Sequence, residues 1–265
     1  MTNAMPVDTQ SPILRVTGLN KSYGDRAALI DANFELWPGE VLAIVGESGS
    51  GKTTLLNALA ARDTPDSGSV EFQIKDGSLT DIFKMTEAQR RLLARTDWGF
   101  VHQNSADGLR MEVSAGANVG ERLMALGHRH YGKLRETACD WLARVEIDPA
   151  RVDDLPRHFS GGMRQRLQIA RNLVTQPRLV FMDEPTSGLD VSVQAKLLDL
   201  LRQLTQHLGL ASIIVTHDLA VARLLAHRMI VMRRGQIVET GLTDQVLDDP
   251  QHPYTQLLVS SVLQP

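Results

Sequence analysis

Three short, largely apolar runs stand out in the sequence. They lie at residues 41–45, 179–182 and 212–215, and each is bounded by polar or glycine-containing segments. Strands buried on both faces of a parallel sheet have this composition, because other elements cover them on either side. The runs therefore predict the buried strands of a parallel sheet.

Alternation of apolar and polar residues marks a second kind of strand. Residues 33–37 and 70–74 alternate in this way, and residues 13–16 also have strand character. A period of two predicts strands with one buried face. Farther along the chain, residues 229–232 and 236–239 flank a short Arg-Arg-Gly turn and predict a hairpin.

Apolar residues at intervals of three and four predict helices, which dominate between residues 85 and 175. The stripes that we interpret as core-facing are Leu134, Ala138, Leu142 and Val145; Met163, Leu167, Ala170 and Val174; and Leu197, Leu201, Leu204 and Leu208. Asp190 is placed to cap the last of these helices, which ends at Gly209. Helices that alternate with buried strands predict an α/β fold.

Length and composition fit one domain with an additional lobe. The chain has 265 residues, of which 43% are hydrophobic, enough for a sizeable core. We expect residues 1–12 to form a flexible polar tail and residues 13–265 to form the domain. The sequence has no run of about 18 apolar residues, so it predicts no membrane-spanning helix.

Charge and cysteine content narrow the class of protein. The net charge of −3 gives no electrostatic argument for binding nucleic acid or a membrane surface. Cys139 is the only cysteine, which excludes disulfides within the chain and any cysteine-rich metal site, and fits a reducing cytoplasm. His128 and His130 lie in a turn without an acidic neighbour in sequence, so we interpret them as structural.

The most informative stretch is Gly-Glu-Ser-Gly-Ser-Gly-Lys-Thr, which follows the apolar run at 41–45 and precedes a helical run at 54–60. Glycines let successive backbone N–H groups point at phosphate oxygens, and the helix start adds a partial positive charge. Lys52 would reach the β- and γ-phosphates, and the Thr53 hydroxyl would bind Mg²⁺. The residues predicted to contact nucleotide here are Gly46, Ser48, Gly49, Ser50, Gly51, Lys52, Thr53 and Thr54.

Two adjacent carboxylates, Asp183 and Glu184, end the apolar run at 179–182. Ligands of open α/β sheets gather at such strand ends. Asp183 suits a role at Mg²⁺ opposite Thr53, and Glu184 could accept a proton from the attacking water or orient it. An Asp-Glu pair by itself is often a solvated loop, but the phosphate-binding loop earlier in the chain favours the catalytic interpretation.

Five further features make the chain resemble an ATP-binding-cassette (ABC) ATPase over nearly its whole length. They are Tyr23, Gln103 after residues 98–102, the Phe-Ser-Gly-Gly-Met segment at 159–163, Ser-Gly-Leu-Asp at 187–190, and His217. The resemblance implies a P-loop NTPase with a mostly parallel core sheet and an antiparallel β subdomain. It also implies an α-helical subdomain at about 105–165.

The resemblance implies a role for each feature within one subunit. Tyr23 would stack on adenine, and Gln103 would join Asp183 at Mg²⁺. His217 would contact the γ-phosphate as the switch histidine. Asp190 would belong to the D-loop of the nucleotide site.

The same resemblance implies a dimer. Ser160, Gly161 and Gly162 would bind the γ-phosphate held by an opposite subunit, so that two ATP molecules are enclosed head to tail. The family usually has Leu and Gln where this chain has Phe159 and Met163. Because the three central residues are intact, activity is expected despite this departure.

Two subfamilies compete within this resemblance. The His-Pro-Tyr-Thr segment at 252–255 resembles ATPases of oligopeptide and dipeptide importers, but residues 104–110 lack the Asn-Pro pair that those proteins tend to carry there. The longer similarity is to ATP-binding proteins of the bacterial carbon–phosphorus lyase system, at residues 34–40, 113–125, 130–132, 159–163 and 248–263.

The second similarity implies a cytoplasmic ATPase of phosphonate catabolism that acts with carbon–phosphorus lyase core subunits. It would be a homodimer or pair with a second ABC protein, and would bind no nucleic acid and insert into no membrane. The alternatives are an importer ATPase and a scaffold that binds ATP without hydrolysing it. Glu184 and His217 argue against the scaffold.

Overall fold

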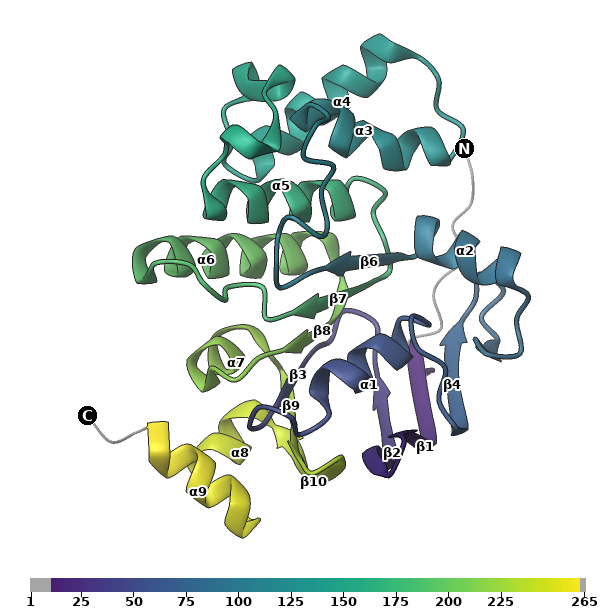
Figure 1. The fold of residues 1–265 in the computed structure, drawn as a ribbon, viewed down its shortest axis with the longest axis vertical. Helices are drawn as coiled ribbons and strands as arrows, with labels where there is room; N and C mark the ends of the chain where they lie inside the picture. Colours follow the sequence, from purple (N-terminus) through teal and green to yellow (C-terminus); the bar gives the residue numbers. More distant parts are fainter. Residues whose placement is uncertain (1–10, 263–265) are drawn as a thin grey trace.

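The computed structural model of the protein describes residues 11–262, which form two sheets and a helical lobe (Figure 1). Residues 1–10 of the expected tail lie outside the described part. Pro12 is buried, and the Ser11 hydroxyl accepts a hydrogen bond of 2.6 Å from the side-chain amide of Gln73. Residues 11 and 12 therefore pack on the domain.

The larger sheet contains the predicted parallel strands. It consists of β3 (Val41–Val45), β6 (Trp98–Val101), β7 (Leu179–Asp183), β8 (Ala211–Val215), β9 (Arg228–Arg233) and β10 (Gln236–Leu242). The order is β10-β9-β3-β8-β7-β6, and all neighbours are parallel except the β9–β10 hairpin. The three apolar runs are thus the adjacent strands β3, β8 and β7, and the predicted hairpin is confirmed.

The smaller sheet is antiparallel and contains the alternating segments. It consists of β1 (Leu14–Tyr23), β2 (Arg26–Leu36), β4 (Ser67–Gln73) and β5 (Leu79–Asp81), in the order β2-β1-β4-β5. Phe72 of this sheet packs edge to face against Trp98 of β6, and Trp98 packs in the same way against Phe181 of β7, with centroid distances of 5.4 and 5.9 Å. Aromatic packing therefore joins the two sheets.

Helices cover the larger sheet and build the lobe. They are α1 (Lys52–Leu59), α2 (Glu87–Thr96), α3 (Ala115–Ala125), α4 (Tyr131–Arg144), the 3₁₀ helices η1 (Pro149–Asp153) and η2 (Pro156–His158), α5 (Gly161–Leu173), α6 (Val191–Leu208), α7 (Leu219–Leu225), α8 (Thr243–Asp248) and α9 (Pro253–Val262). In Figure 1, α3, α4 and α5 lie together at the top as the lobe.

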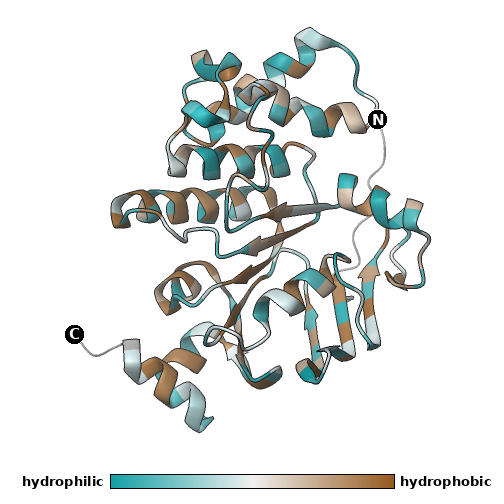
Figure 2. Ribbon diagram, viewed as in Figure 1, coloured by the Kyte–Doolittle hydropathy of each residue, from teal (hydrophilic) through white to brown (hydrophobic). Residues whose placement is uncertain are grey.

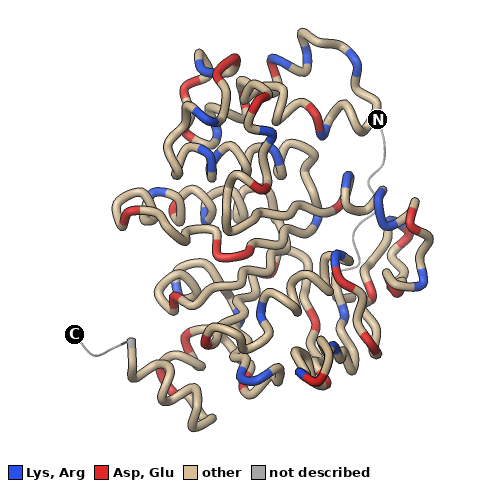
Figure 3. Tube along the Cα trace, in the orientation of Figure 1, with Lys and Arg blue, Asp and Glu red and all other residues tan. Residues whose placement is uncertain are grey.

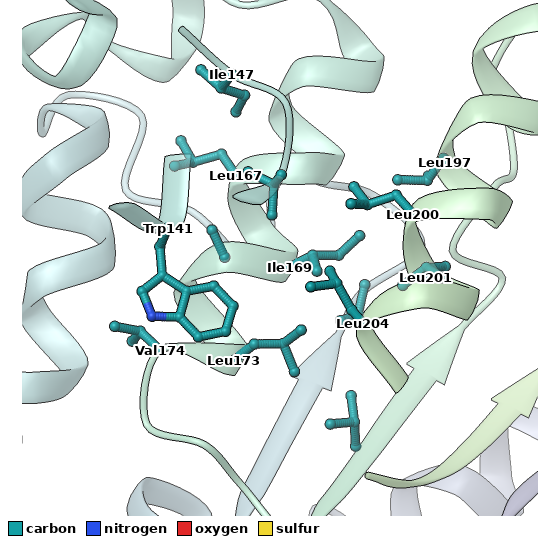
Figure 4. Packing of buried hydrophobic residues seen from close by; sticks show 14 of the residues in the cluster. Trp141, Ile147, Leu167, Ile169, Leu173, Val174, Leu197, Leu200, Leu201 and Leu204 are labelled. Carbon is teal, nitrogen blue, oxygen red and sulfur yellow. The ribbon is translucent and has the colours of Figure 1, made fainter. Parts of the chain in front are cut away.

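The predicted apolar stripes meet where the lobe joins the sheet. Figure 4 shows Trp141 of α4 beside Leu173 of α5, while Ile169 of α5 faces Leu204 of α6, all within one buried cluster. The strands of the larger sheet are the most continuously hydrophobic part of the fold (Figure 2). Charges of both signs are spread over the smaller sheet, the helices and the lobe, and are sparse on the central strands of the larger sheet (Figure 3).

The mostly helical prediction for residues 85–175 misses one strand. Residues 98–101 form β6, which pairs in parallel with β7, and the side chain of Val101 is buried. Four residues are too few for a period of two to be distinguished from one turn of helix. Pairing with β7 therefore decides the conformation.

β6 is the last strand of the larger sheet, and side chains of α5 pair with its free edge. The backbone N–H groups of Phe100 and His102 donate to the side-chain oxygens of Asn172 and Gln168, at 3.0 and 2.5 Å. The Gln168 amide also donates to the carbonyl of His102 at 3.2 Å, and both α5 side chains are buried. Helix α5 thus takes the place of a further strand and fixes the lobe to the sheet.

Candidate active site

The candidate site residues follow the carboxyl ends of four neighbouring strands. The glycine-rich loop follows β3, Gln103 follows β6, Asp183 ends β7 and His217 follows β8. Because β3, β8, β7 and β6 are adjacent and parallel, these ends lie along one edge of the sheet. Residues separated by more than 160 positions in the sequence therefore converge.

The ammonium group of Lys52 is enclosed by the loop itself. The side chain is 6% exposed, and Nζ donates to the carbonyl oxygens of Gly46 and Glu47, both at 2.8 Å. Burial lowers the pKa of Lys52, and the nearby carboxylates of Glu184 and Asp183 offset only part of this effect. Gly46 has a φ of +147°, and a Cβ there would lie 2.2 Å from the carbonyl oxygen of Met232, so this position requires glycine.

The Thr53 hydroxyl and the Asp183 carboxylate form the candidate metal site. Thr53 Oγ1 donates to Asp183 Oδ1 at 3.4 Å. Burial, and then the neighbouring charge of Glu184, raises the pKa of Asp183. Across residues 11–262 no cluster of three or more His, Cys, Asp or Glu side chains could hold a metal alone. One hydroxyl and one carboxylate fit Mg²⁺, which commonly takes few protein ligands and completes its shell with phosphates and water.

The Glu184 carboxylate contacts two other predicted site residues, His217 and Gln103. Its Oε1 lies 3.0 Å from His217 Nδ1, and its Oε2 accepts a hydrogen bond from Gln103 Nε2 at 3.1 Å. With Glu184 as a carboxylate, this contact is a hydrogen bond when Nδ1 of His217 is the protonated ring nitrogen. Gln103 also donates to the Ser187 hydroxyl at 3.2 Å, and its expected role at the metal stays a prediction.

The backbone of Glu184 has an unusual conformation. Its φ is +41°, in the left-handed region that residues with a Cβ rarely adopt, and its N–H donates to the carbonyl of Val215 at 2.9 Å. Such strain persists only where the surrounding structure holds it, and it is concentrated at functional sites. The strain therefore supports a functional role for this carboxylate.

Most of the candidate residues border one cavity of about 880 Å³, whereas Gly46, Ser50 and Asp183 do not line it. Its lining residues are Tyr23, Arg26, Ala28, Ser48, Gly49, Gly51, Lys52, Thr53, Thr54, Gln103, Glu184, Ser187 and His217. Tyr23 is 52% exposed, and its hydroxyl donates to Asp63, which raises the pKa of Tyr23. The Lys21 ammonium lies 5.2 Å from the centroid of this ring, and the expected stacking of Tyr23 on adenine stays a prediction.

Arg26 is a lining residue that the sequence did not reveal. Its guanidinium donates to the carbonyl of Gly49 in the glycine-rich loop at 3.1 Å. It lies at the start of β2, directly after the β1–β2 turn, and no motif marks it. Its only signal is its position three residues after Tyr23.

The signature segment lies outside this cavity. Ser160 is the N-cap of α5, and its hydroxyl accepts a hydrogen bond from the Met163 N–H at 3.3 Å. A Cβ on Gly162 would lie 2.5 Å from Cγ1 of Val193 in α6, so this glycine lets the two helices approach closely. Asp190 is the N-cap of α6 as predicted, although its side chain makes no capping hydrogen bond.

Arg151 connects the two unusual residues of the signature segment. Its guanidinium carbon lies 4.5 Å from the ring centroid of Phe159, and Nη1 lies 3.3 Å from the sulfur of Met163. Its Nε also donates to Asp154 at 2.7 Å. Phe159 and Met163, which flank the Ser-Gly-Gly triplet, therefore both contact the Arg151 side chain.

His130 has a structural contact at the start of α4. It is the N-cap of this helix, and its Nδ1 accepts a hydrogen bond from the Lys133 N–H at 3.2 Å. This bond satisfies a backbone donor at the helix start. For His128 the structural interpretation stays a prediction.

Comparison with known proteins defines the class. The family model described as ABC transporter matches residues 29–187, and the model described as the oligopeptide/dipeptide transporter C-terminal region matches residues 238–265. The chain belongs to the ABC transporter family, as an ATP-binding protein of the ATPase type. The predicted family and enzyme class are confirmed.

Among individual relatives, PhnK of Escherichia coli (strain K12) is 64% identical over 253 residues, covering 96% of this chain and 98% of that protein. PhnK is described as an ATP-binding protein of phosphonates utilization. A Brucella ovis protein described as a peptide import ATP-binding protein is 36% identical over 261 residues, covering 97% of this chain and 80% of its own length.

Solved structures confirm the fold class. The ATP-binding cassette MJ0796, in a dimeric post-hydrolysis state bound to ADP and Pi, matches with a TM-score of 0.77 and 30% identity over 87% of this chain and 98% of its own. CbiO1 of Clostridium perfringens matches with a TM-score of 0.79 and 28% identity, over 91% and 92%. Among the helices of residues 11–262, none has the length and hydrophobicity needed to cross a membrane.

Proposed function

We propose that this protein is a cytoplasmic MgATP-hydrolysing subunit of phosphonate catabolism that works with carbon–phosphorus lyase core subunits. The observation that carries the proposal is the 64% identity to PhnK over almost the full length of both chains. The peptide import relative is only 36% identical, and this chain spans 80% of it. The ATPase itself is common to both relatives, whereas the partner differs.

The geometry of the cavity supports separate roles for its residues in phosphate binding, Mg²⁺ binding and activation of water. Lys52 and the loop N–H groups would bind the phosphates, and Thr53 with Asp183 would hold Mg²⁺. The metal, when bound, neutralises charge on the phosphates. Glu184, oriented by the Gln103 amide and by His217, would position the attacking water and accept its proton. Tyr23, Gly46, Ser48, Gly49, Ser50, Gly51 and Thr54 complete the proposed nucleotide contacts.

The signature segment supports a dimeric arrangement. Ser160, Gly161 and Gly162 begin a helix whose first N–H groups suit an anion, yet they do not line their own cavity. In the proposed dimer, homomeric or with a second ABC protein, they bind the γ-phosphate of the opposite subunit, with Asp190 nearby. The dimeric state of MJ0796 is consistent with this arrangement.

The test is a pull-down of the tagged protein from cells that grow on a phosphonate as their only phosphorus source. Mass spectrometry of the soluble and membrane fractions then identifies the partners. Recovery of lyase subunits in the soluble fraction is the expected outcome. Cells grown on inorganic phosphate, in which such a pathway is not needed, are the control.

The second candidate is the ATPase of a peptide importer. It is favoured by the match of residues 238–265 to the oligopeptide/dipeptide transporter C-terminal region. The same pull-down separates the two functions. A polytopic permease in the membrane fraction, without lyase subunits, would contradict the phosphonate proposal and support the importer.

A further inference from the structure

The C-terminal helix α9 contacts the glycine-rich loop directly. Tyr254, the second residue of α9, is 7% exposed. Its hydroxyl accepts a hydrogen bond of 3.0 Å from the backbone N–H of Glu47, although the two residues are 207 positions apart in the sequence. The His-Pro-Tyr-Thr segment at 252–255 therefore contacts the phosphate-binding loop. The proposed mechanism of hydrolysis assigns no role to this segment.

The hydrogen bond acts on a particular peptide group. The N–H of Glu47 and the carbonyl of Gly46 belong to the same planar unit. Lys52 Nζ donates to that carbonyl at 2.8 Å, while Tyr254 accepts from the N–H. The peptide is therefore held at both ends, and its orientation directs the carbonyl toward the ammonium group.

Tyr254 is itself fixed to the β9–β10 hairpin. The Glu239 carboxylate accepts hydrogen bonds from the N–H groups of Gln251 and His252, at 2.8 and 3.0 Å, and these bonds help to lower the pKa of Glu239. His252 Nδ1 accepts from the N–H of Tyr254 at 3.1 Å, and the Arg233 guanidinium lies 4.8 Å from the tyrosine ring centroid. The hydroxyl is thus held by an ordered segment.

The same hairpin supports the other end of the loop. The N–H of Gly235 donates to the carbonyl of Ser50 at 2.8 Å. The loop therefore rests on β3, on the hairpin and on α9. Two side chains also contact the loop: Arg26 of β2 donates to the Gly49 carbonyl, and Tyr254 of α9 accepts from the Glu47 N–H. Of these two, Tyr254 contacts the Gly46–Glu47 peptide, whose carbonyl accepts from Lys52.

We propose that Tyr254 is a positioning residue for nucleotide binding. Its hydroxyl fixes the Gly46–Glu47 peptide so that Lys52 and the loop are preformed before phosphate arrives. Less conformational freedom then has to be lost on binding. The inference rests on nucleotide binding at this loop and does not depend on which partner the protein has.

The test compares Tyr254→Phe with Tyr131→Phe. Both variants lose one hydroxyl oxygen, but Tyr131 is 73% exposed and lies in the helical lobe. For Tyr254→Phe we expect the Kd for MgATP to rise roughly three- to tenfold, the usual worth of one hydrogen bond. Amide hydrogen exchange at Glu47 should accelerate as well. Tyr131→Phe should match wild type in both measurements.

Two outcomes would overturn the inference. In one, Tyr254→Phe binds MgATP as tightly as Tyr131→Phe. In the other, its affinity falls while exchange at Glu47 stays at the wild-type rate, so that the hydroxyl acts through general stability and not through this peptide. A wild-type protein that binds no nucleotide would instead refute the nucleotide site itself.

Discussion

The glycine-rich loop and the signature segment are both glycine-containing turns that begin a helix, yet the chain surrounds them differently. The loop encloses Lys52, which is 6% exposed, and it is supported by β3, the β9–β10 hairpin and α9. The signature segment begins α5 with an exposed Ser160, and Arg151 of its own lobe contacts the residues that flank the triplet.

The difference shows that a helix start is not by itself a complete site. At the loop, the same chain also supplies a buried ammonium group, a hydroxyl, a carboxylate and a cavity of about 880 Å³. At the signature segment, the chain supplies backbone N–H donors, and Gly162 lets α5 approach α6 closely. One region thus carries the groups that the proposed nucleotide site requires, and in the proposed dimer the other would be completed by a second surface.

The largest effect is expected from Glu184→Gln, which tests whether the two regions form one site. Gln keeps the size of the side chain but cannot accept a proton from water, so kcat should fall by at least about a hundredfold while ATP binding persists. Steady-state ATPase assays and light scattering measure both effects. In the proposed head-to-tail dimer, the variant accumulates as an ATP-bound dimer. Hydrolysis at the wild-type rate would contradict the assignment of Glu184.

A smaller effect is expected from Gly162→Ala, which disturbs only the signature region. The added Cβ would lie 2.5 Å from Val193 Cγ1, so α5 must shift away from α6. We expect the ATPase rate to fall about tenfold, the scale of a small displacement of a reacting group, with unchanged Kd for MgATP.

The control for Gly162→Ala is the double variant with Val193→Ala, which removes the clashing methyl groups and should recover most of the activity. Equal losses of activity in the single and double variants would show that the clash is not the cause. A raised Kd for MgATP would show that a change in the signature region also affects nucleotide binding at the loop.

The smallest effect is a shift in the melting temperature of the nucleotide-free protein, expected from Asp183→Asn, which tests the electrostatics of the loop region. Burial raises the pKa of Asp183 above 3.8, so the folded state binds the proton more tightly than the unfolded state. The ionised carboxylate therefore costs stability that develops as the pH rises from 3.8 to that raised pKa and is complete above it. Without nucleotide at pH 7, Asp183→Asn should melt about one or two degrees higher, and the gain should vanish in acid.

Thermal unfolding measured between pH 4 and pH 8 checks this expectation. A variant that melts below wild type at pH 7 would show that Asp183 stabilises the free protein. ATP hydrolysis should be lost in either case if Asp183 holds Mg²⁺.

Local patterns predicted the central strands and part of the candidate site, whereas Tyr23, Gln103 and His217 were predicted from the family resemblance. The runs at 41–45, 179–182 and 212–215 are recognisable because burial on both faces demands apolar residues throughout. The loop residues, Asp183 and Glu184 directly follow such runs, so their place at one sheet edge follows from the parallel arrangement. Local sequence patterns were therefore sufficient to predict the positions of the loop residues, Asp183 and Glu184.

Contacts between distant residues could not be predicted in this way. β6 is a strand because β7 lies beside it, and Arg26 reaches Gly49 only because the smaller sheet folds over the loop. Nothing in the sequence near Tyr254 indicates that its hydroxyl meets Glu47. Such contacts depend on the assembled fold, since no local period or motif encodes them.

The pairing of α5 with the free edge of β6 also limits how the protein can associate. An exposed strand edge invites another strand, from a second copy or an aggregating chain, to extend the sheet. Here Asn172 and Gln168 already occupy the N–H groups of Phe100 and His102. Growth of the larger sheet by strand addition is therefore blocked at its β6 edge, and a partner that meets this edge contacts α5 and does not extend the sheet.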